Sequence, residues 1–212
     1  MLKVSEIFYS IQGESSLQGY PSVFIRLAGC NLNCSFCDTE YAKTGGSPFS
    51  VDEIVEQVKK FPCTRVTITG GEPLMQKETV ELARKLLSES FDVQVETNGS
   101  FDINVLPEGV RCILDIKTPG SRESSKNDWL NIDRLTKGDE VKFVLTSPDD
   151  YEWAKNRVKE YALTDRFTVL FSPVSSMLAP SVLAESILKD SLNVKLHLQI
   201  HKIIWPDRER GV

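Results

Sequence analysis

The sequence has no excess of basic residues and no long apolar segment. Its 25 Lys and Arg are outnumbered by 30 Asp and Glu, which gives a formal net charge of -5. Proteins that bind nucleic acid mainly through its phosphate backbone usually carry a basic excess, so nucleic acid is not expected as the main partner. The apolar runs are far too short to span a bilayer, and no membrane partner is expected either.

Signals for export and for division into parts are also lacking. The first ten residues, MLKVSEIFYS, contain no basic stretch followed by an apolar core, as a secretory signal peptide would. We therefore expect a cytoplasmic protein. No repeat or long linker divides the 212 residues, which predicts one domain over 1–212. The Ser- and Gly-rich segment 118–128 is expected to be a long surface loop.

The sequence does contain an alternation of short apolar segments with helical patterns. The predicted strands are 23–28, 65–69, 92–96, 112–117, 141–145, 167–171 and 194–200. The predicted helices are 51–60, 77–90, 149–161 and 180–189. Ser50 with Glu53, and the pair Ser147-Pro148, are typical of helix N-termini. This alternation predicts an α/β fold with a largely parallel sheet.

Each predicted strand has one aliphatic face and one face that carries charged or hydrogen-bonding groups. Arg26, Glu96 and Lys142 lie on the polar faces. In 194–200 the same alternation sets His197, Gln199 and His201 opposite Leu196, Leu198 and Ile200. Both faces of a helix-covered parallel sheet are buried, so these charges need partners or a polar ligand. An antiparallel sheet with one solvated face is the alternative. We favour an incomplete, TIM-like β/α barrel with a ligand-filled interior.

Residues 28–42, AGCNLNCSFCDTEYA, hold three of the five cysteines, spaced C-x3-C-x2-C, with no fourth cysteine nearby. In the cytosol such a cluster indicates metal ligands or redox groups. Buried structural cysteines are one interpretation. A structural zinc site is another; it takes four ligands, which His197 or His201 could complete. The third is a four-iron, four-sulfur cluster on Cys30, Cys34 and Cys37, with one iron open to an external molecule.

The cysteine triplet, together with TITGGEP at 67–73, resembles the radical S-adenosylmethionine (SAM) superfamily. The resemblance implies that the open iron chelates the methionine part of SAM, and that an electron from the cluster releases a 5'-deoxyadenosyl radical. The residues that we predict to bind SAM are Phe36, Asp38, Gly70, Gly71, Glu72, Glu96, Asn98, Lys117 and Lys142.

Further segments resemble the 7-carboxy-7-deazaguanine synthase family: 6–42, VETNGS (95–100), DIKTPGS (115–121), SPV (172–174) and LQIHKIIWP (198–206). That family usually has QGEG where this sequence has Ser15 in place of the last glycine. The resemblance implies a ring contraction of 6-carboxy-5,6,7,8-tetrahydropterin to 7-carboxy-7-deazaguanine, with loss of ammonia, on the route to queuosine. It also implies Mg²⁺ bound by Thr39, a homodimer, and a flavodoxin or ferredoxin as reductant.

The predicted substrate-binding residues are Ile11, Gln12, Gly13, Glu14, Arg26, Thr69, Gln199 and His201. They belong to an N-terminal turn at about 6–20, to the polar face of the sheet and to a C-terminal tail that closes the pocket. Arg26 suits a carboxylate; its alternative is an internal salt bridge with Glu96 or Asp115. Two other functions remain open, an activase that installs a glycyl radical on a partner protein and a metal-binding module without turnover.

Overall fold

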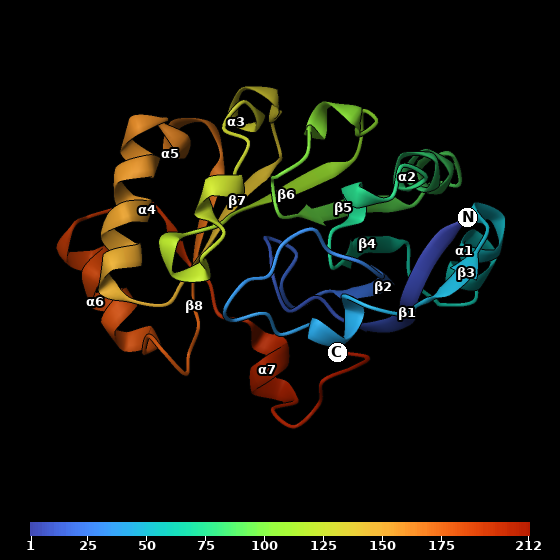
Figure 1. The fold of residues 1–212 in the computed structure, drawn as a ribbon, viewed down its shortest axis with the longest axis horizontal. Helices are drawn as coiled ribbons and strands as arrows, with labels where there is room; N and C mark the ends of the chain where they lie inside the picture. Colours follow the sequence, from blue (N-terminus) through green and yellow to red (C-terminus); the bar gives the residue numbers. More distant parts are fainter.

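A nine-stranded sheet forms the centre of the computed structural model, which describes residues 1–212 (Figure 1). The strands are β1 (Leu2–Ile11), β2 (Pro21–Leu27), β3 (Ser47–Phe49), β4 (Arg65–Gly70), β5 (Asp92–Thr97), β6 (Arg111–Ile116), β7 (Glu140–Leu145), β8 (Thr168–Pro173) and β9 (Lys195–Leu196). Their order is β3-β1-β2-β4-β5-β6-β7-β8-β9. From β2 to β9 all pairings are parallel, whereas β1 pairs antiparallel with β2 and β3. The sheet is open, which confirms the predicted partial barrel.

The helices lie mainly at the two ends of the sheet. They are α1 (Val51–Val58), α2 (Thr79–Ser88), α3 (Asn131–Arg134), α4 (Pro148–Glu160), α5 (Leu163–Arg166), α6 (Pro180–Lys189) and α7 (Ile200–Ile204). Short 3₁₀ turns are η1 (Glu40–Ala42), η2 (Pro73–Met75), η3 (Ile103–Val105), η4 (Pro119–Ser121) and η5 (Ser124–Lys126). In Figure 1, α1 and α2 lie at one end, α4 to α6 at the other, and α7 stands apart from both groups. None of the helices is long and apolar enough to cross a membrane.

The predicted helix starts are confirmed. The Ser50 side chain accepts a hydrogen bond from the Glu53 N–H at 3.2 Å, and the Glu53 carboxylate accepts one from the Ser50 N–H at 2.7 Å, a complete capping box. Helix α4 begins after Ser147, whose side chain accepts from the Asp150 N–H, with Pro148 as its first residue. These local signals therefore set the first residues of α1, which follows β3, and of α4, which follows β7.

The aliphatic faces of the strands pack against the helices in two clusters. Ile25, Ile68 and Val95 pack with residues of α1 and α2, and Phe143 and Phe171 pack with residues of α4 and α6. The opposite faces carry the polar groups, and these are buried too: Arg26 is 9% exposed and Lys142 is 6% exposed. The alternative of an antiparallel sheet with a solvated polar face is therefore wrong.

The predicted strand at 194–200 is wrong. Strand β9 contains only Lys195 and Leu196, and helix α7 already begins at Ile200. The alternation itself holds for the first residues: Leu196 pairs with the core residue Phe171, and His197 follows on the opposite face, where it is completely buried. The chain leaves the sheet because the Ile200 N–H donates to the Gly13 carbonyl at 3.1 Å, which draws this segment to the N-terminal turn.

Strand β1 was not predicted, and it takes up the first part of the expected N-terminal turn. Residues 6–11 belong to this strand, so that the turn itself covers 12–20. Ser15 lies in this turn at φ +63°, a conformation that a glycine adopts without strain. The segment 118–128 is a loop as predicted, but it contains η4 and η5, and Thr118 and Ser121 in it are fully buried.

Candidate active site

The three clustered cysteines follow β2 in a loop that neighbouring segments hold in place. Gly29, at φ +95°, turns the chain out of the sheet, and the Cys37 N–H donates to the Cys34 carbonyl at 3.3 Å. All three thiols are free and partly exposed. Burial raises the pKa of the Cys30 and Cys34 thiols, so a positively charged metal group would be needed to hold them as thiolates at neutral pH.

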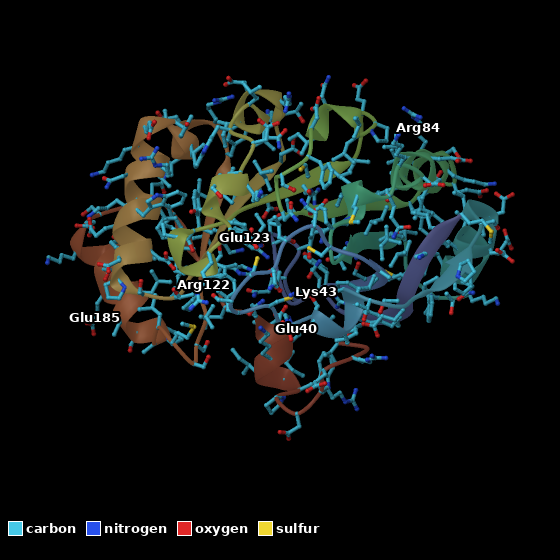
Figure 2. The ribbon with its side chains drawn as sticks, in the orientation of Figure 1. Glu40, Lys43, Arg84, Arg122, Glu123 and Glu185 are labelled. Atoms are coloured by element: carbon cyan, nitrogen blue, oxygen red, sulfur yellow. The ribbon has the colours of Figure 1, made fainter.

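Asn33, in the middle of this loop, is held from two sides. Its N–H donates to the Glu123 carboxylate at 2.8 Å, and Lys43 Nζ donates to its side-chain carbonyl at 2.8 Å. Figure 2 shows Lys43 and Glu123 in the central part of the molecule, whereas Arg84 and Glu185 lie on the outer helices. The Ser35 hydroxyl also donates to the Gly120 carbonyl at 2.7 Å. The segment predicted as a surface loop at 118–128 therefore supports the cysteine loop.

The two glycines of TITGGEP end β4 directly beside the start of the cysteine loop. A Cβ atom at Gly70 would lie 2.3 Å from the Leu27 carbonyl oxygen, and Gly70 has φ +150°. A Cβ atom at Gly71 would lie 2.1 Å from the Gly29 carbonyl oxygen and 2.8 Å from Cys30 Cβ. All three distances are far below van der Waals contact. Glycine is therefore required here so that the two backbones can pack against each other.

Glu72 is buried beneath this turn and joins it to the end of β5. Its Oε1 accepts from the Leu74 N–H at 2.9 Å and from the Thr97 hydroxyl at 2.7 Å, and its Oε2 accepts from the Asn98 N–H at 2.6 Å. Burial raises its pKa in spite of these three donors. The structure thus puts Glu72, predicted to bind SAM, in a supporting position and not on the cavity wall.

A cavity of about 200 Å³ lies on the polar face of the sheet, next to the cysteine loop. Apart from Glu72, every residue predicted for the site lines it. These are Ile11, Gln12, Gly13, Glu14, Arg26, Cys30, Cys34, Phe36, Cys37, Asp38, Thr39, Thr69, Gly70, Gly71, Glu96, Asn98, Lys117, Lys142, Gln199 and His201. Residues from five strands, the N-terminal turn, the cysteine loop and α7 thus meet in one place. Those from β2, β4 and β5 lie at the carboxyl ends of these parallel strands, as expected.

Buried charges of both signs line this cavity. Lys142 Nζ lies 2.5 Å from Glu14 Oε2 and 3.4 Å from Asp115 Oδ2, and Lys117 Nζ lies 3.0 Å from the same Asp115 oxygen. Burial alone would raise the pKa of Glu14, but Lys142, with smaller effects of His197 and His201, holds it well below its usual range. The pKa of Lys142 is raised in turn, because its carboxylate neighbours outweigh the effect of burial. Glu14 and Lys142 are therefore an ion pair at neutral pH.

Arg26 has a different partner from those considered from the sequence. Its Nε lies 2.8 Å from Glu6 Oε1 on β1, and it makes no salt bridge with Glu96 or Asp115. Glu96 instead accepts from the Thr69 hydroxyl at 3.1 Å and from the Gln12 amide at 3.4 Å. Burial and the neighbouring Glu14 raise the pKa of Glu96.

Gln199 and His201 reach the cavity from the start of α7, not from a strand. The Gln199 amide donates to Glu14 Oε1 at 2.5 Å. His201 packs so closely on the N-terminal turn that a Cβ atom at Gly13 would lie 1.9 Å from its Nδ1. Lys202 Nζ lies 2.6 Å from Asp38 Oδ2. Helix α7 is thus attached both to the N-terminal turn and to the cysteine loop.

His197 was left out of the predicted site, and the structure buries it behind the cavity wall. The register of β8 and β9 puts Ser172 beside it, since Phe171 pairs with Leu196 and the His197 N–H donates to the Phe171 carbonyl at 2.9 Å. Both ring nitrogens of His197 and the Ser172 hydroxyl are buried without a hydrogen-bond partner. Burial lowers the pKa of His197 to about 4, so the ring is neutral at physiological pH.

Comparison with known proteins agrees with this geometry. The profile of the Radical SAM superfamily matches residues 24–159. Over its full length the chain is 41% identical to the 7-carboxy-7-deazaguanine synthase of Chlorobaculum tepidum, 97% of which is covered. It is 39% identical to the synthase of Koribacter versatilis, with both chains completely covered. The chain belongs to the 7-carboxy-7-deazaguanine synthase family of radical SAM enzymes.

A solved structure supports the fold of this family member. The crystal structure of QueE from Escherichia coli superposes with a TM-score of 0.77 over 93% of both chains, at 22% sequence identity. At this identity the likeness concerns the fold. The shared architecture is the open, largely parallel sheet described above.

Membership of the radical SAM superfamily implies a four-iron, four-sulfur cluster and SAM, and the residues fit both. No three His, Cys, Asp or Glu side chains lie close enough together to hold a single metal ion, whereas a cluster of four irons binds thiolates that stand farther apart. The three cysteines line one cavity, with the Asn98 amide 3.9 Å from Cys30 Sγ. The polar cavity beside them offers both carboxylates and ammonium groups to a zwitterionic ligand.

Asp115 and Lys202 are among the cavity residues that were not in the predicted site. Glu6, which lies behind Arg26 and does not line the cavity, was missed as well. Asp115 could have been predicted, because it lies two residues before Lys117 on the same polar face, and Lys117 was in the predicted site. Lys202 follows His201 directly in the segment 198–206. It was missed because this segment was predicted to begin in a strand, whereas it forms α7. Glu6 was hidden, because β1 was not predicted as a strand.

We predict that Glu72→Gln lowers the free energy of unfolding by about 1–3 kcal/mol, since the new amide would face one of three buried donors and leave it unpaired. Urea denaturation followed by circular dichroism measures the change. Glu81→Gln, at an exposed position of α2, is the matched control, with an expected change within about 0.5 kcal/mol. Equal transitions for both variants would contradict the supporting role of Glu72.

We further predict that His197→Leu flattens the dependence of stability on pH. The native imidazole has a pKa of about 4, lowered from 6.5, so between these values the unfolded chain binds a proton that the native chain does not. Wild-type stability should therefore fall by up to about 3 kcal/mol more than that of the variant as pH drops through this interval. Urea denaturation at a series of pH values tests this, and parallel profiles would refute it.

Proposed function

We propose that the chain catalyses the ring contraction of 6-carboxy-5,6,7,8-tetrahydropterin to 7-carboxy-7-deazaguanine, with loss of ammonia. The observation that carries this proposal is the single cavity in which the cysteine triplet, the glycine turn and the predicted pterin-binding residues meet. The full-length similarity to synthases of that name supports it. SAM is a recycled cofactor in this proposal.

Cys30, Cys34 and Cys37 would hold the cluster, which together with SAM supplies a 5'-deoxyadenosyl radical when both are bound. The proposed SAM-binding residues are Phe36, Asp38, Gly70, Gly71, Glu96, Asn98, Lys117 and Lys142. Phe36 and Asp38 flank the last cysteine, and Asn98 lies next to the first. Lys142 also pairs with Glu14, so it would orient a substrate-binding carboxylate as well.

Gln12 and Glu14 would read the amide-and-amine edge of the pterin. Glu14 suits this role because it is ionised and because Lys142 and Gln199 hold one oxygen each, so its direction is set before the substrate binds. Its free lone pairs can accept from the pterin amine and ring N–H. Arg26 would bind the substrate carboxylate, while Ile11, Gly13, Thr69 and His201 would complete the pocket wall.

Thr39 would provide the protein ligand for Mg²⁺. It lines the cavity, and its hydroxyl lies 3.9 Å from Cys37 Sγ. A single neutral oxygen binds Mg²⁺ weakly, but this cation commonly takes its remaining ligands from substrate and water. A carboxylate of the substrate fits that requirement.

The remaining proposals concern the setting of the reaction. We propose one domain over 1–212, in which the turn at 12–20 binds substrate and α7 closes the cavity; the contacts of His201 with Gly13 and of Lys202 with Asp38 support this. By family resemblance we also propose a cytoplasmic homodimer that receives electrons from a flavodoxin or ferredoxin and whose product enters queuosine synthesis.

We predict that the anaerobically reconstituted protein, given 6-carboxytetrahydropterin, SAM, a reductant and Mg²⁺, forms 7-carboxy-7-deazaguanine. Mass analysis of the products measures this. Cys34→Ala should lose both the visible absorption of the cluster and SAM cleavage, because the cluster would lack one of its three thiolates. Cys63→Ala, which changes a cysteine outside the cavity, is the matched control and should retain both. A wild-type protein that cleaves SAM without forming the product would refute the proposed substrate.

We predict that Thr39→Ala weakens the response of the rate to Mg²⁺ and leaves the cluster absorption intact. The physical reason is the loss of the one protein oxygen that the cation would bind. Rates measured over a range of Mg²⁺ concentrations test this, with Thr44→Ala as a control that lies outside this cavity. An unchanged Mg²⁺ response would end the role proposed for Thr39.

A further inference from the structure

A β-bulge in β1 brings a carboxylate to Arg26. In the antiparallel pair of β1 and β2, Val4 lies opposite Leu27 and Glu6 lies opposite Arg26, so β1 has one residue more than β2 between these two pairs. Residues directly opposite each other in such a pair share one face of the sheet. Glu6 and Arg26 therefore point to the same side.

The extra residue decides which face Glu6 occupies. Val4 belongs to the apolar core, and strict alternation would put Glu6 on that same face. After the bulge the order is reversed: Ile7 packs against the core, and Phe8 stacks on Phe24 with ring centroids 4.9 Å apart on the other face. A bulge next to an active site commonly redirects a side chain in this way.

Glu6 engages one particular nitrogen of Arg26. The Glu6 Oε1 atom lies 2.8 Å from Nε, and the two side chains are 17% and 11% exposed. The guanidinium also lies 5.6 Å from the ring centre of Phe8 and 6.0 Å from that of Tyr41. Its two terminal nitrogens make no hydrogen bond to the protein, and Arg26 lines the cavity. The planar end of the guanidinium is thus left for a ligand.

The Glu6 carboxylate is itself held by two further segments. The Tyr41 hydroxyl donates to Oε1 at 2.7 Å, and the Gly211 N–H donates to Oε2 at 3.2 Å. In Figure 1 the C-terminus accordingly lies near β1 and β2. Burial and the bond to Glu6 raise the pKa of Tyr41 to about 12, so its hydroxyl remains a donor at neutral pH.

We propose that Glu6 is a positioning residue that makes the site selective for a substrate carboxylate. By holding Nε it fixes the plane of the Arg26 guanidinium, so that the two terminal nitrogens can bind a carboxylate bidentately. This rests on the proposed function and deepens it, because it assigns the selectivity to the Glu6–Arg26 pair. If Glu6 only neutralised the charge of Arg26, it would weaken the binding of the substrate carboxylate, and removing it would increase the selectivity.

The test compares two pterins that differ only in the carboxylate. Dissociation constants of 6-carboxytetrahydropterin and of unsubstituted tetrahydropterin are measured with the anaerobic, cluster-containing enzyme in the presence of SAM. We expect Glu6→Ala and Glu6→Gln to lower the preference for the carboxylated pterin, the former by about tenfold or more. Binding of the unsubstituted pterin should change little. Glu40→Gln removes the same charge from a side chain that is 71% exposed and should leave the preference within about twofold.

An unchanged or increased preference in the Glu6 variants would overturn the proposal. If the wild-type enzyme prefers the carboxylated pterin and the variants do so equally, only the role of Glu6 is lost. If the wild-type enzyme shows no preference, both the role of Glu6 and the proposed substrate are refuted. Cluster absorption and thermal unfolding report whether each variant is intact; should Glu6→Ala fail to fold, Glu6→Gln, which keeps the size of the side chain, decides the outcome.

Discussion

Lys117 and Lys142 are buried between carboxylates on the inner face of the sheet, and this pairing makes the rest of the site possible. An unpaired buried charge is prohibitively costly, so each group depends on the others. Glu14 is held to Lys142, and Asp115 contacts both lysines. The cavity is therefore lined by groups whose directions are largely set before a ligand binds. Such preorganisation is what substrate positioning requires.

The open sheet is completed by segments from the two ends of the chain. The N-terminal turn and α7 contact each other directly, through the Ile200 N–H and the Gly13 carbonyl at 3.1 Å. The segment 118–128 supports the cysteine loop from outside through Ser35 and Asn33. Because the sheet is open, the cavity on its polar face is not closed by strands alone, and the N-terminal turn and α7 form part of its wall. Functional residues on loops are thus positioned by a rigid, parallel scaffold.

Local patterns predicted the parallel sheet because each strand and helix depended on a short stretch of sequence, whereas the family resemblance supplied most of the residues proposed for the site. The alternation in β7 put Lys142 on one face and Phe143 on the other, and the structure agrees. Ser50 and Glu53 marked the start of α1 for the same reason. The errors lie where the outcome depends on distant contacts. Residues 194–200 alternate like a strand, yet they leave the sheet at His197, because the N-terminal turn competes for the backbone of Ile200. Glu72 follows the glycine pair like a ligand-binding residue, but donors in η2 and at the end of β5 hold its carboxylate away from the cavity wall.

The sequence by itself determined the cysteine spacing, the glycine pair, the alternation of β2 and β4 to β8 with the longer helices, and the polar face on which the site lies. These follow from short-range periodicity and from the chemistry of single residue types. Only the tertiary structure decided that Arg26 pairs with Glu6, because a bulge of one residue reverses which face of β1 meets the cavity. It also decided that α7 and not a strand carries His201 to the site. Both outcomes depend on register and on the docking of remote segments, which no local pattern specifies.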